Sequence, residues 1–283
     1  MRLINYRDAG SFLKRTRTAL EVREEENGLM LGLCLRLNQS TRPVKQAPYF
    51  AAVEDAEGLA GAAMMTPPYK LIVYTDREDC DAAMEVIAAN LREQDWPVPG
   101  ILGLPHAVEA LARAWQSVSG ARARESMRQR FYVLTQVRQS ASPGGTLRVA
   151  AEADIDWVVR WARRFHEEVF GEAHLEDALE VVTRRIQAGD IYVWEDGRPV
   201  SIAARSRPTP NGMTVNLVYT PPKYRRQGYA TACVAAVSHR QLDSGKRFCT
   251  LSADLANPTS NSIYQKIGYR PVCDFSEYVF GDV

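Results

Sequence analysis

The stretch that decides the fold reads Val218-Tyr219-Thr220-Pro221-Pro222-Lys223-Tyr224-Arg225-Arg226-Gln227-Gly228-Tyr229-Ala230-Thr231. An apolar strand here runs into a basic loop with one glycine, and a helix follows the loop at once. Such a loop presents unpaired backbone N–H groups at the N-terminus of the helix, where the helix dipole favours negative charge. Gly228 permits close approach of a ligand to the backbone, and Ala230 keeps the first helical turn small. The stretch therefore predicts an anion site.

Two arginines in the same loop add positive charge to this site. Arg225 and Arg226 carry guanidinium groups, which suit phosphate oxygens in charge and geometry. Taken alone, the loop fits a solvated basic turn before an amphipathic helix equally well. A second segment further along the chain bears on this choice.

The second segment reads Asn257-Pro258-Thr259-Ser260-Asn261-Ser262-Ile263-Tyr264-Gln265-Lys266-Ile267-Gly268-Tyr269. Asn257 is a good N-cap, Pro258 suits the first helical position, and Gly268 suits the left-handed residue that ends a helix. At about 100° per residue, Asn257, Asn261 and Tyr264 share one edge of this helix. Capping is the more ordinary role of an asparagine like Asn257, and half-buried packing is the more ordinary role of a tyrosine like Tyr264.

Together, the two segments resemble the GNAT superfamily of acetyl-CoA-dependent N-acetyltransferases. The family's pyrophosphate loop has Arg or Gln, two residues, Gly, one residue, and then Gly or Ala, which Arg225, Gly228 and Ala230 fill. Residues 257–269 are similar to the family's second CoA-facing segment, an Asn-capped helix that carries a Tyr and ends at Gly and an aromatic residue. The resemblance covers about residues 146–280 well, and the first half only as a degenerate copy.

The resemblance implies transfer of an acetyl group from acetyl-CoA to an amine, which attacks the thioester directly and is helped chiefly by proximity. In the family the strands that carry the two segments splay apart, and the pantetheine arm lies between them. Tyr264 is then implied as the proton donor to the departing thiolate, since tyrosine has a pKa near 10 and a thiol one near 8.5. No metal is implied. The implied cofactor-binding residues are Leu217, Val218, Tyr219, Arg225, Arg226, Gln227, Gly228, Tyr229, Ala230, Thr231, Asn257 and Asn261.

One departure from the family concerns the general base. Many members place a carboxylate on the strand before the pyrophosphate loop, but residues 198–220 contain no Asp or Glu, and Thr214 and Asn216 stand there instead. The proton of the amine would then pass to water or to a group near the end of the first helix of this half. The candidates there are His166, Glu167, Glu168 and His174, and a solvated helix end explains each of them as well.

A polar segment rich in Ser, Gly and Pro, residues 138–145, predicts the domain boundary. The predicted domains are residues 1–140, a degenerate GNAT-like domain, and residues 146–283, the catalytic domain. The predicted class is α/β (α+β), with two tandem domains that each have a mixed, mostly antiparallel central sheet flanked by helices. In the second half we expect strands at 146–151, 191–194, 200–204, 213–220, 248–254 and 278–280, and helices from 154, at 175–187, from about 230 and at 258–267.

A weak internal repeat supports this duplication. Leu71-Ile72-Val73-Tyr74-Thr75 and Leu217-Val218-Tyr219-Thr220 share their Val-Tyr-Thr ending, and a similar strand order precedes each. If Thr75 corresponds to Thr220, the loop positions of Arg225, Gly228 and Ala230 fall on Cys80, Ala83 and Glu85, among several acidic residues. The first half is therefore expected not to bind CoA. It could close the acceptor pocket or mediate dimerisation.

Composition limits the partners. The 283 residues carry 35 Lys and Arg against 34 Asp and Glu, a net charge of +1, which gives no broad attraction to nucleic acid or an anionic membrane. No signal peptide or membrane-spanning run is apparent. Five cysteines at wide spacing, without a CxxC pair, predict buried thiols of a reducing cytoplasm.

Three functions remain in view. We expect a cytoplasmic N-acetyltransferase whose partner is an amine-bearing acceptor, a small molecule or a peptide, and a homodimer is left open. The alternative is a non-catalytic protein that binds CoA for regulation, which the missing strand carboxylate favours and Tyr264 opposes. A nucleotide-binding module is disfavoured, because no P-loop lysine or GxGxxG motif follows a strand.

Overall fold

The computed structural model describes residues 1–40, 46–138, 143–171 and 178–281. The chain divides into two compact units. The first unit contains Met1–Phe131, Ala253–Asn257 and Val272–Val283, and the second contains Tyr132–Ser252 and Pro258–Pro271. Each unit is described by itself below.

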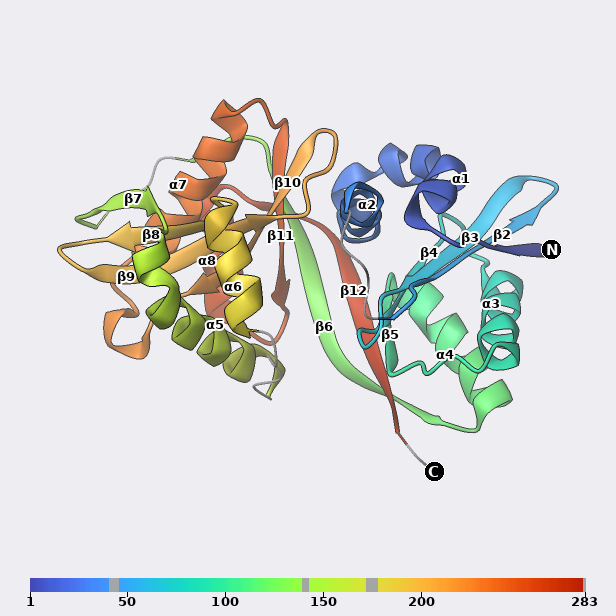
Figure 1. The fold of residues 1–283 in the computed structure, drawn as a ribbon. Helices are drawn as coiled ribbons and strands as arrows, with labels where there is room; N and C mark the ends of the chain where they lie inside the picture. Colours follow the sequence, from blue (N-terminus) through green and yellow to red (C-terminus); the bar gives the residue numbers. More distant parts are fainter. Residues whose placement is uncertain (41–45, 139–142, 172–177, 282–283) are drawn as a thin grey trace. The chain divides into compact units, whose positions relative to one another are not determined.

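The first unit has a sheet with helices on both faces (Figure 1). Strands β1 to β4 pair antiparallel in chain order, and β4 pairs parallel with β5. Its elements are β1 (Arg2–Asn5), α1 (Ala9–Val22), α2 (Glu24–Gln39), β2 (Tyr49–Asp55), β3 (Gly58–Met65), β4 (Leu71–Tyr74), α3 (Asp81–Glu93), β5 (Gly100–Gly103), α4 (Pro105–Ser119) and β6 (Arg122–Leu134).

Burial on both faces explains why β2 reads as a continuous apolar run. Phe50 packs with residues of α1 and α2, whereas Tyr49, Ala51 and Val53 pack with residues of α3 and α4. Successive side chains of a strand point to opposite faces, so a strand covered by helices on both sides needs apolar residues at every position. This burial forms the two cores of the unit.

The second half of the chain repeats the same order of elements. They are β7 (Thr146–Val149), α5 (Ile155–Phe170), α6 (Ala178–Gln187), β8 (Ile191–Glu195), β9 (Pro199–Ser206), β10 (Gly212–Tyr219), α7 (Tyr229–Asp243), β11 (Phe248–Asp254), α8 (Pro258–Ile267) and β12 (Arg270–Gly281). Short 3₁₀ turns at Glu152–Asp154 and Pro222–Tyr224 are additions to this order. Each half thus reads strand, two helices, three strands, helix, strand, helix, strand, and the predicted duplication is confirmed. We call the two halves the first and the second repeat.

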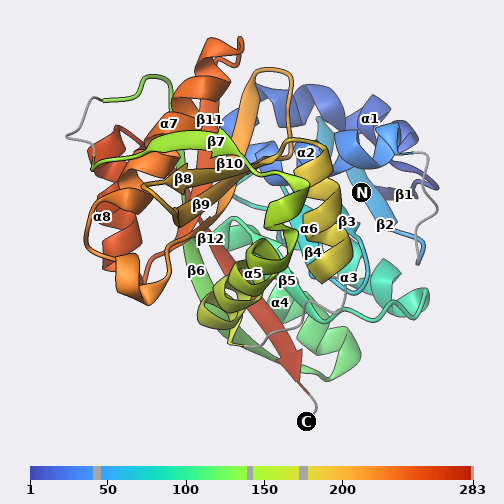
Figure 2. The same cartoon turned by 60° about the vertical axis from the view of Figure 1, so that its left-hand side comes forward.

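Helices also cover both faces of the sheet in the second unit (Figure 2). Ile191 and Val193 of β8 pack with α5 and α6. Between them along the strand, Tyr192 has its hydroxyl 3.3 Å from Nε2 of Gln241 on α7. Successive side chains of β8 therefore pack on opposite faces of the sheet, as those of β2 do in the first unit.

The last strand of the chain belongs to the first unit. Ser276–Val279 of β12 pair antiparallel with Gly100–Gly103 of β5, and Glu277 lies within hydrogen-bond reach of Gln129 and Lys70. Conversely, the end of β6 from Tyr132 onward falls with the second unit. The division by contacts is thus not the pair of continuous segments, 1–140 and 146–283, that the sequence led us to expect.

Most expected elements of the second repeat are present with small shifts. The bounds of β11 and α8 coincide with those expected, and the strand expected at 278–280 is longer. The helix expected at 175–187 begins at Ala178 among the described residues, and its Leu179 is 56% exposed. The buried stripe of α6 instead follows Ala178, Val182 and Ile186, a spacing of four that leaves Leu179 beside it. Leu175 lies outside the described residues.

Candidate functional site

Strands β10 and β11 pair only at their beginnings. Their parallel ladder joins Gly212 to Phe248, Met213 to Cys249 and Thr214 to Thr250, and the described pairing stops there. On the other side of β10, the register with β9 shifts between Asn216 and Tyr219. Past Thr214 the β11-facing backbone of β10 is therefore outside this ladder, which is the divergence that the resemblance implied.

Leu217 lies inside this irregularity of β10 and has a left-handed backbone, with φ of 51°. A residue other than glycine rarely adopts this conformation, and the cost is of order 1–3 kcal/mol. Its side chain is buried with residues of α5 and α6. The surrounding core thus holds a strained bulge in β10, which redirects the backbone groups of the residues next to it.

The loop after β10 ends at an open helix N-terminus. Gly228 is the N-cap of α7, with φ of 87°, and makes no side-chain hydrogen bond to the first N–H groups of the helix. Arg226 is also left-handed, with φ of 62°. Because Gly228 has no Cβ, these N–H groups can meet an anion at close range. A glycine therefore stands where the sequence predicted the anion site, and the binding of an anion there stays a prediction.

Side chains of the loop point in different directions. Nε2 of Gln227 donates to the carbonyl oxygen of Lys223 at 3.2 Å, and the Tyr229 hydroxyl donates to Oδ2 of Asp196 at 2.7 Å. Arg225, Arg226 and Gln227 are exposed, and Ala230 and Thr231 are half-buried in the first turn of α7. Tyr229 thus fixes the start of α7 to the turn between β8 and β9.

Arg225 is held by three neighbours. Its Nη2 donates to Oε1 and Oε2 of Glu168 on α5 at 2.8 and 2.7 Å, and its Nε donates to the carbonyl oxygen of Thr220 at 2.9 Å. The guanidinium carbon lies 5.8 Å from the centre of the Tyr219 ring. Both carboxylate oxygens of Glu168 are therefore engaged by the guanidinium of Arg225.

Tyr264 of α8 is deeply buried. It is 8% exposed, and its ring centre lies 6.2 Å from that of Tyr132 and 6.1 Å from that of Tyr269. Burial, and secondarily the neighbouring Tyr132, raises the pKa of Tyr264 to about 12. The pKa near 10 that the sequence led us to expect for Tyr264 is therefore too low. Complete transfer to an exposed thiolate, whose acid has a pKa of about 8.5, would cost about 5 kcal/mol.

Burial acts on thiols in the same unit as well. It raises the pKa of the Cys249 thiol on β11 to about 12. The Cys249 thiol therefore stays protonated at neutral pH.

The two asparagines of the second segment have different surroundings. Oδ1 of Asn261 accepts a hydrogen bond from the Tyr132 hydroxyl at 2.7 Å. Asn257 directly precedes α8, its backbone N–H donates to Asp254 at 3.0 Å, and the contact-based division assigns it to the first unit. Gly268 has φ of 115°, so the left-handed helix end expected there is confirmed. The helices of both segments, α7 and α8, pack against each other.

Comparison with known proteins shows the fold. Residues 197–279 match the family model described as FR47-like protein, and no curated protein matches the sequence significantly. A GCN5-related N-acetyltransferase from Sphaerobacter thermophilus is 14% identical, with a TM-score of 0.63 over 98% of this chain and 94% of that one. An acetyltransferase of the GNAT family from Colwellia psychrerythraea is 11% identical, with a TM-score of 0.58 over 99% and 100%. A tandem GNAT protein from the clavulanic acid biosynthesis pathway, without AcCoA, is 13% identical, with a TM-score of 0.55 over 100% of both chains.

The chain has the tandem GNAT fold. The FR47-like match spans the loop after β10 and the whole of α8, so the two segments that carried the resemblance lie inside it. The comparison structures cover both repeats, in agreement with the shared order of elements.

In this GNAT fold the two residues at the expected place of a basic carboxylate, Thr214 and Asn216, are engaged with other protein side chains. Oδ1 of Asn216 accepts a hydrogen bond from Arg185 of α6 at 2.8 Å, and the hydroxyl of Thr214 lies 3.2 Å from that of Thr250. His166 packs against Phe170, and burial lowers its pKa, so its imidazole is neutral at pH 7. Glu167 is exposed, and His174 lies outside the described residues.

The first GNAT repeat has a shorter loop. Helix α3 starts six residues after Thr75, whereas α7 starts nine residues after Thr220. Aligning the two helix starts places Arg77 at the position of Arg225 and Cys80 at that of Gly228. The register assumed from the sequence was therefore wrong by three residues, because it could not show the shorter loop.

Arg77 is tied to the sheet of its own repeat. Its guanidinium forms two parallel hydrogen bonds with the carboxylate of Asp55, one of them 2.9 Å long, and the hydrogen bond from Arg77 holds the pKa of Asp55 at about 2. His106 lies 3.2 Å from the carbonyl oxygen of Arg77. The acidic residues Glu78 and Asp79 follow. The cation of this loop is therefore already paired with Asp55, and two acidic residues follow it.

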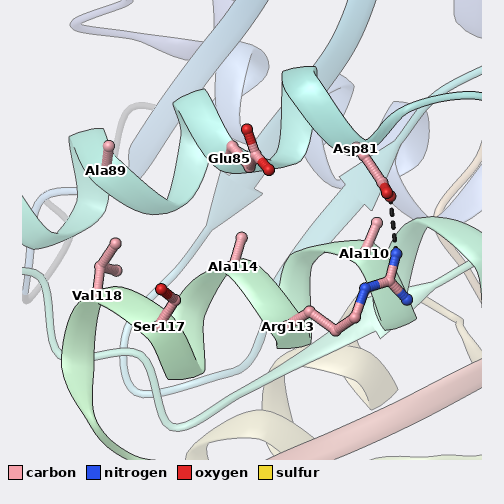
Figure 3. Close-up of a pocket in the computed structure, with 8 residues that line it drawn as sticks. All are labelled: Asp81, Glu85, Ala89, Ala110, Arg113, Ala114, Ser117 and Val118. Carbon is pink, nitrogen blue, oxygen red and sulfur yellow. Dashed lines mark hydrogen bonds and ion pairs between the residues drawn. The ribbon is translucent and has the colours of Figure 1, made fainter.

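A groove of about 400 Å³ lies between α3 and α4 of the first unit (Figure 3). An ion pair of 2.8 Å between Asp81 and Arg113 crosses one end of it. Glu85 and mostly small side chains line the rest, and no lining residue belongs to the loop after β10 or to α8. The lining residues are Asp81, Glu85, Ala89, Ala110, Arg113, Ala114, Ser117 and Val118.

Within residues 1–40, 46–138, 143–171 and 178–281, no helix is both long and apolar enough to cross a membrane. In the same residues, no cluster of three His, Cys, Asp or Glu side chains is arranged to hold a metal ion. All five cysteines are described and are free thiols, four of them buried and Cys273 half-buried.

Proposed function

We propose that the second repeat binds acetyl-CoA and transfers its acetyl group to an amine acceptor. The observation that carries the proposal is the divergence of β10 from β11 after Thr214, next to the open N-terminus of α7. Backbone groups at Leu217, Val218 and Tyr219 would bond the pantetheine arm. The carbonyl oxygen of Tyr219 already accepts a hydrogen bond from Ser201 at 3.3 Å and has a second lone pair for a ligand.

The pyrophosphate would lie against the loop that joins β10 to α7. N–H groups from Arg225 to Thr231 would bind its oxygens, and the absence of a Cβ at Gly228 allows the close approach. Arg226 is exposed on the same loop and adds positive charge. Asn257 and Asn261 remain proposed contacts from the second segment.

The chemistry would rest mainly on positioning. An unprotonated amine held in line with the thioester attacks it directly, without a covalent enzyme intermediate. The C–S bond then breaks, and the CoA thiolate takes up a proton from water. Tyr264 is proposed to donate a hydrogen bond to this sulfur, because its raised pKa keeps the hydroxyl protonated throughout the working pH range. The proton of the amine would leave to water or to neutral His166.

A second function is favoured by a specific observation. Asn216, at the expected place of a basic carboxylate, is bonded to Arg185 instead. A protein that binds CoA for regulation needs the anion site but no base.

The acceptor, the location and the assembly are also proposals. The acceptor would be an amine on a small molecule or peptide, with no nucleic acid or membrane as a partner. The protein would act in the cytoplasm, and a homodimer is left open.

The deciding experiment follows free thiol release from acetyl-CoA in the presence of a panel of amines. Release that depends on one class of amine, and that yields the acetylated amine by mass spectrometry, supports the transferase. Tight binding of acetyl-CoA with no amine-dependent release over the whole panel supports the regulatory protein. Absence of both binding and release contradicts the proposal.

A further inference from the structure

The arginine proposed to face the pyrophosphate is already bound to an anion of the protein. Nη2 of Arg225 contacts both carboxylate oxygens of Glu168, at 2.8 and 2.7 Å. Glu168 lies near the C-terminal end of α5, two residues before Phe170. A carboxylate and a phosphate use the same kind of charge-assisted hydrogen bond to a guanidinium, so they compete for it.

We propose that the ion pair between Glu168 and Arg225 is a latch that the pyrophosphate of CoA must displace. The proposal rests on the proposed CoA site. In the free protein the latch keeps Arg225 turned toward α5, and CoA binding exchanges one anion for another on Nη2. The apparent affinity for CoA is then reduced by the fraction of molecules in which the latch is closed. Binding also releases the end of α5 from the loop.

The first repeat provides an internal comparison. Arg77, at the position of Arg225, donates two parallel hydrogen bonds to Asp55, and the side chains are 23% and 21% exposed. Arg225 uses a single nitrogen for Glu168, and the two side chains are 42% and 45% exposed. Exposure and poorer geometry both weaken an ion pair. The pair in the second repeat is therefore the one that a ligand can open.

Other contacts of Arg225 favour an exchange over complete release. Its Nε donates to the Thr220 carbonyl oxygen at 2.9 Å, and its guanidinium lies over the Tyr219 ring. Neither contact involves α5. Arg225 can therefore leave Glu168 while its remaining contacts keep it beside the loop.

The test compares two substitutions that remove the same charge from adjacent residues. Glu168→Gln opens the latch, whereas Glu167→Gln changes an exposed carboxylate that has no ion pair among the described residues. Titration calorimetry of the full chain with CoA should show about two- to five-fold tighter binding for Glu168→Gln, the range expected for an exposed ion pair. Glu167→Gln should bind as the wild type does. In an Arg225→Gln background, Glu168→Gln should no longer tighten binding.

The outcomes of these titrations test the latch and the CoA site separately. Equal CoA affinity of Glu168→Gln and Glu167→Gln, with clear binding by the wild type, overturns the latch and leaves the CoA site standing. An effect of Glu168→Gln that persists in the Arg225→Gln background assigns it to general charge and also overturns the latch. Absence of CoA binding by the wild type and both single variants overturns the latch together with the proposed function.

Discussion

Nη2 of Arg185 on α6 lies 2.8 Å from Oδ1 of Asn216 on β10, and the same nitrogen lies 3.1 Å from the carbonyl oxygen of Arg205. A cation therefore holds the residue at which the GNAT resemblance led us to look for a base. An amide does not accept a proton near neutral pH, and a guanidinium at this distance would keep even an introduced carboxylate ionised and weakly basic. Asn216 is therefore no base, and the proposed deprotonation of an amine would use another group.

The first prediction concerns this proton. With water as the acceptor of the proton, kcat/KM should rise with pH toward the pKa of the amine, about 10.4 if it resembles lysine. With His166 as the base, activity should also be lost at low pH, below the lowered pKa of its imidazole, as the ring becomes protonated. Replacing Glu167, Glu168, His166 and His174 one at a time, and recording a pH profile for each, separates the two cases.

Only His166→Gln should remove an acid limb of the profile. Glu168→Gln is expected to alter CoA affinity without changing the shape of the profile, because its carboxylate is bound by Arg225. Profiles that stay unchanged in all four variants exclude a side-chain base at this helix end. Water, or a residue outside this region, then remains.

The second prediction is that acetyl-CoA binds once per chain, at the loop after β10. Gly228→Glu places a carboxylate at the N-terminus of α7 and should abolish the calorimetric signal. Gly245→Glu is the matched control: Gly245 also has a left-handed backbone, with φ of 97°, and a Cβ there would meet open space. Both variants introduce the same side chain and charge at a left-handed glycine, although a Cβ at Gly228 would also contact Pro143 at 3.5 Å. Two equivalent sites, or unchanged binding by Gly228→Glu, would contradict the assignment.

Local signals in the sequence predicted several element boundaries well. Pro258 at the first position of α8 and the left-handed Gly268 after its end gave both bounds of that helix. The start of α7 at Tyr229 lies within one residue of the start expected at about 230, directly after Gly228. In each case, residues within one turn of the boundary determine the backbone.

Contacts between distant segments explain what could not be predicted. Arg185 and Asn216 are 31 residues apart, and Arg225 and Glu168 are 57 apart, so no local pattern joins them. The left-handed Leu217 is imposed by its packing, since leucine has no preference for that conformation. The burial that raises the pKa of Tyr264 is likewise a property of the folded core. The assignment of β12 to the first unit likewise follows from its pairing with β5, a strand far from it in the sequence.

The third prediction tests how firmly β12 is joined to the first unit. The Glu277 carboxylate is 10% exposed and pairs with Lys70, which is 27% exposed, while Gln129 donates to it at 3.3 Å. Removing one member of a buried pair costs 3–5 kcal/mol and of an exposed pair about 1 or less, so Glu277→Ala should cost about 2 kcal/mol. Urea unfolding followed by circular dichroism measures the change.

Glu57→Ala is the control for this measurement. Glu57 is 83% exposed and lies 3.8 Å from Arg77, so its removal should change the free energy of unfolding by no more than about 0.5 kcal/mol. Equal effects of the two substitutions would mean that the Glu277 contacts do not stabilise the attachment of β12.

The fourth prediction is that Tyr264→Phe lowers kcat by about 10² or more while the affinity for acetyl-CoA stays within a few-fold. The hydroxyl is proposed to meet the sulfur only as charge develops there, so its loss should act on the chemical step. Since burial raises the pKa of Tyr264 to about 12, its ionisation should cause no loss of wild-type activity below about pH 11.

Tyr269→Phe is the matched control, because this neighbouring buried hydroxyl lies 2.8 Å from Ser238 on α7. That variant should lower stability and leave kcat unchanged. Full turnover by Tyr264→Phe with the true acceptor, under conditions where chemistry limits the rate, would make Tyr264 a packing residue, as its place between Tyr132 and Tyr269 also allows.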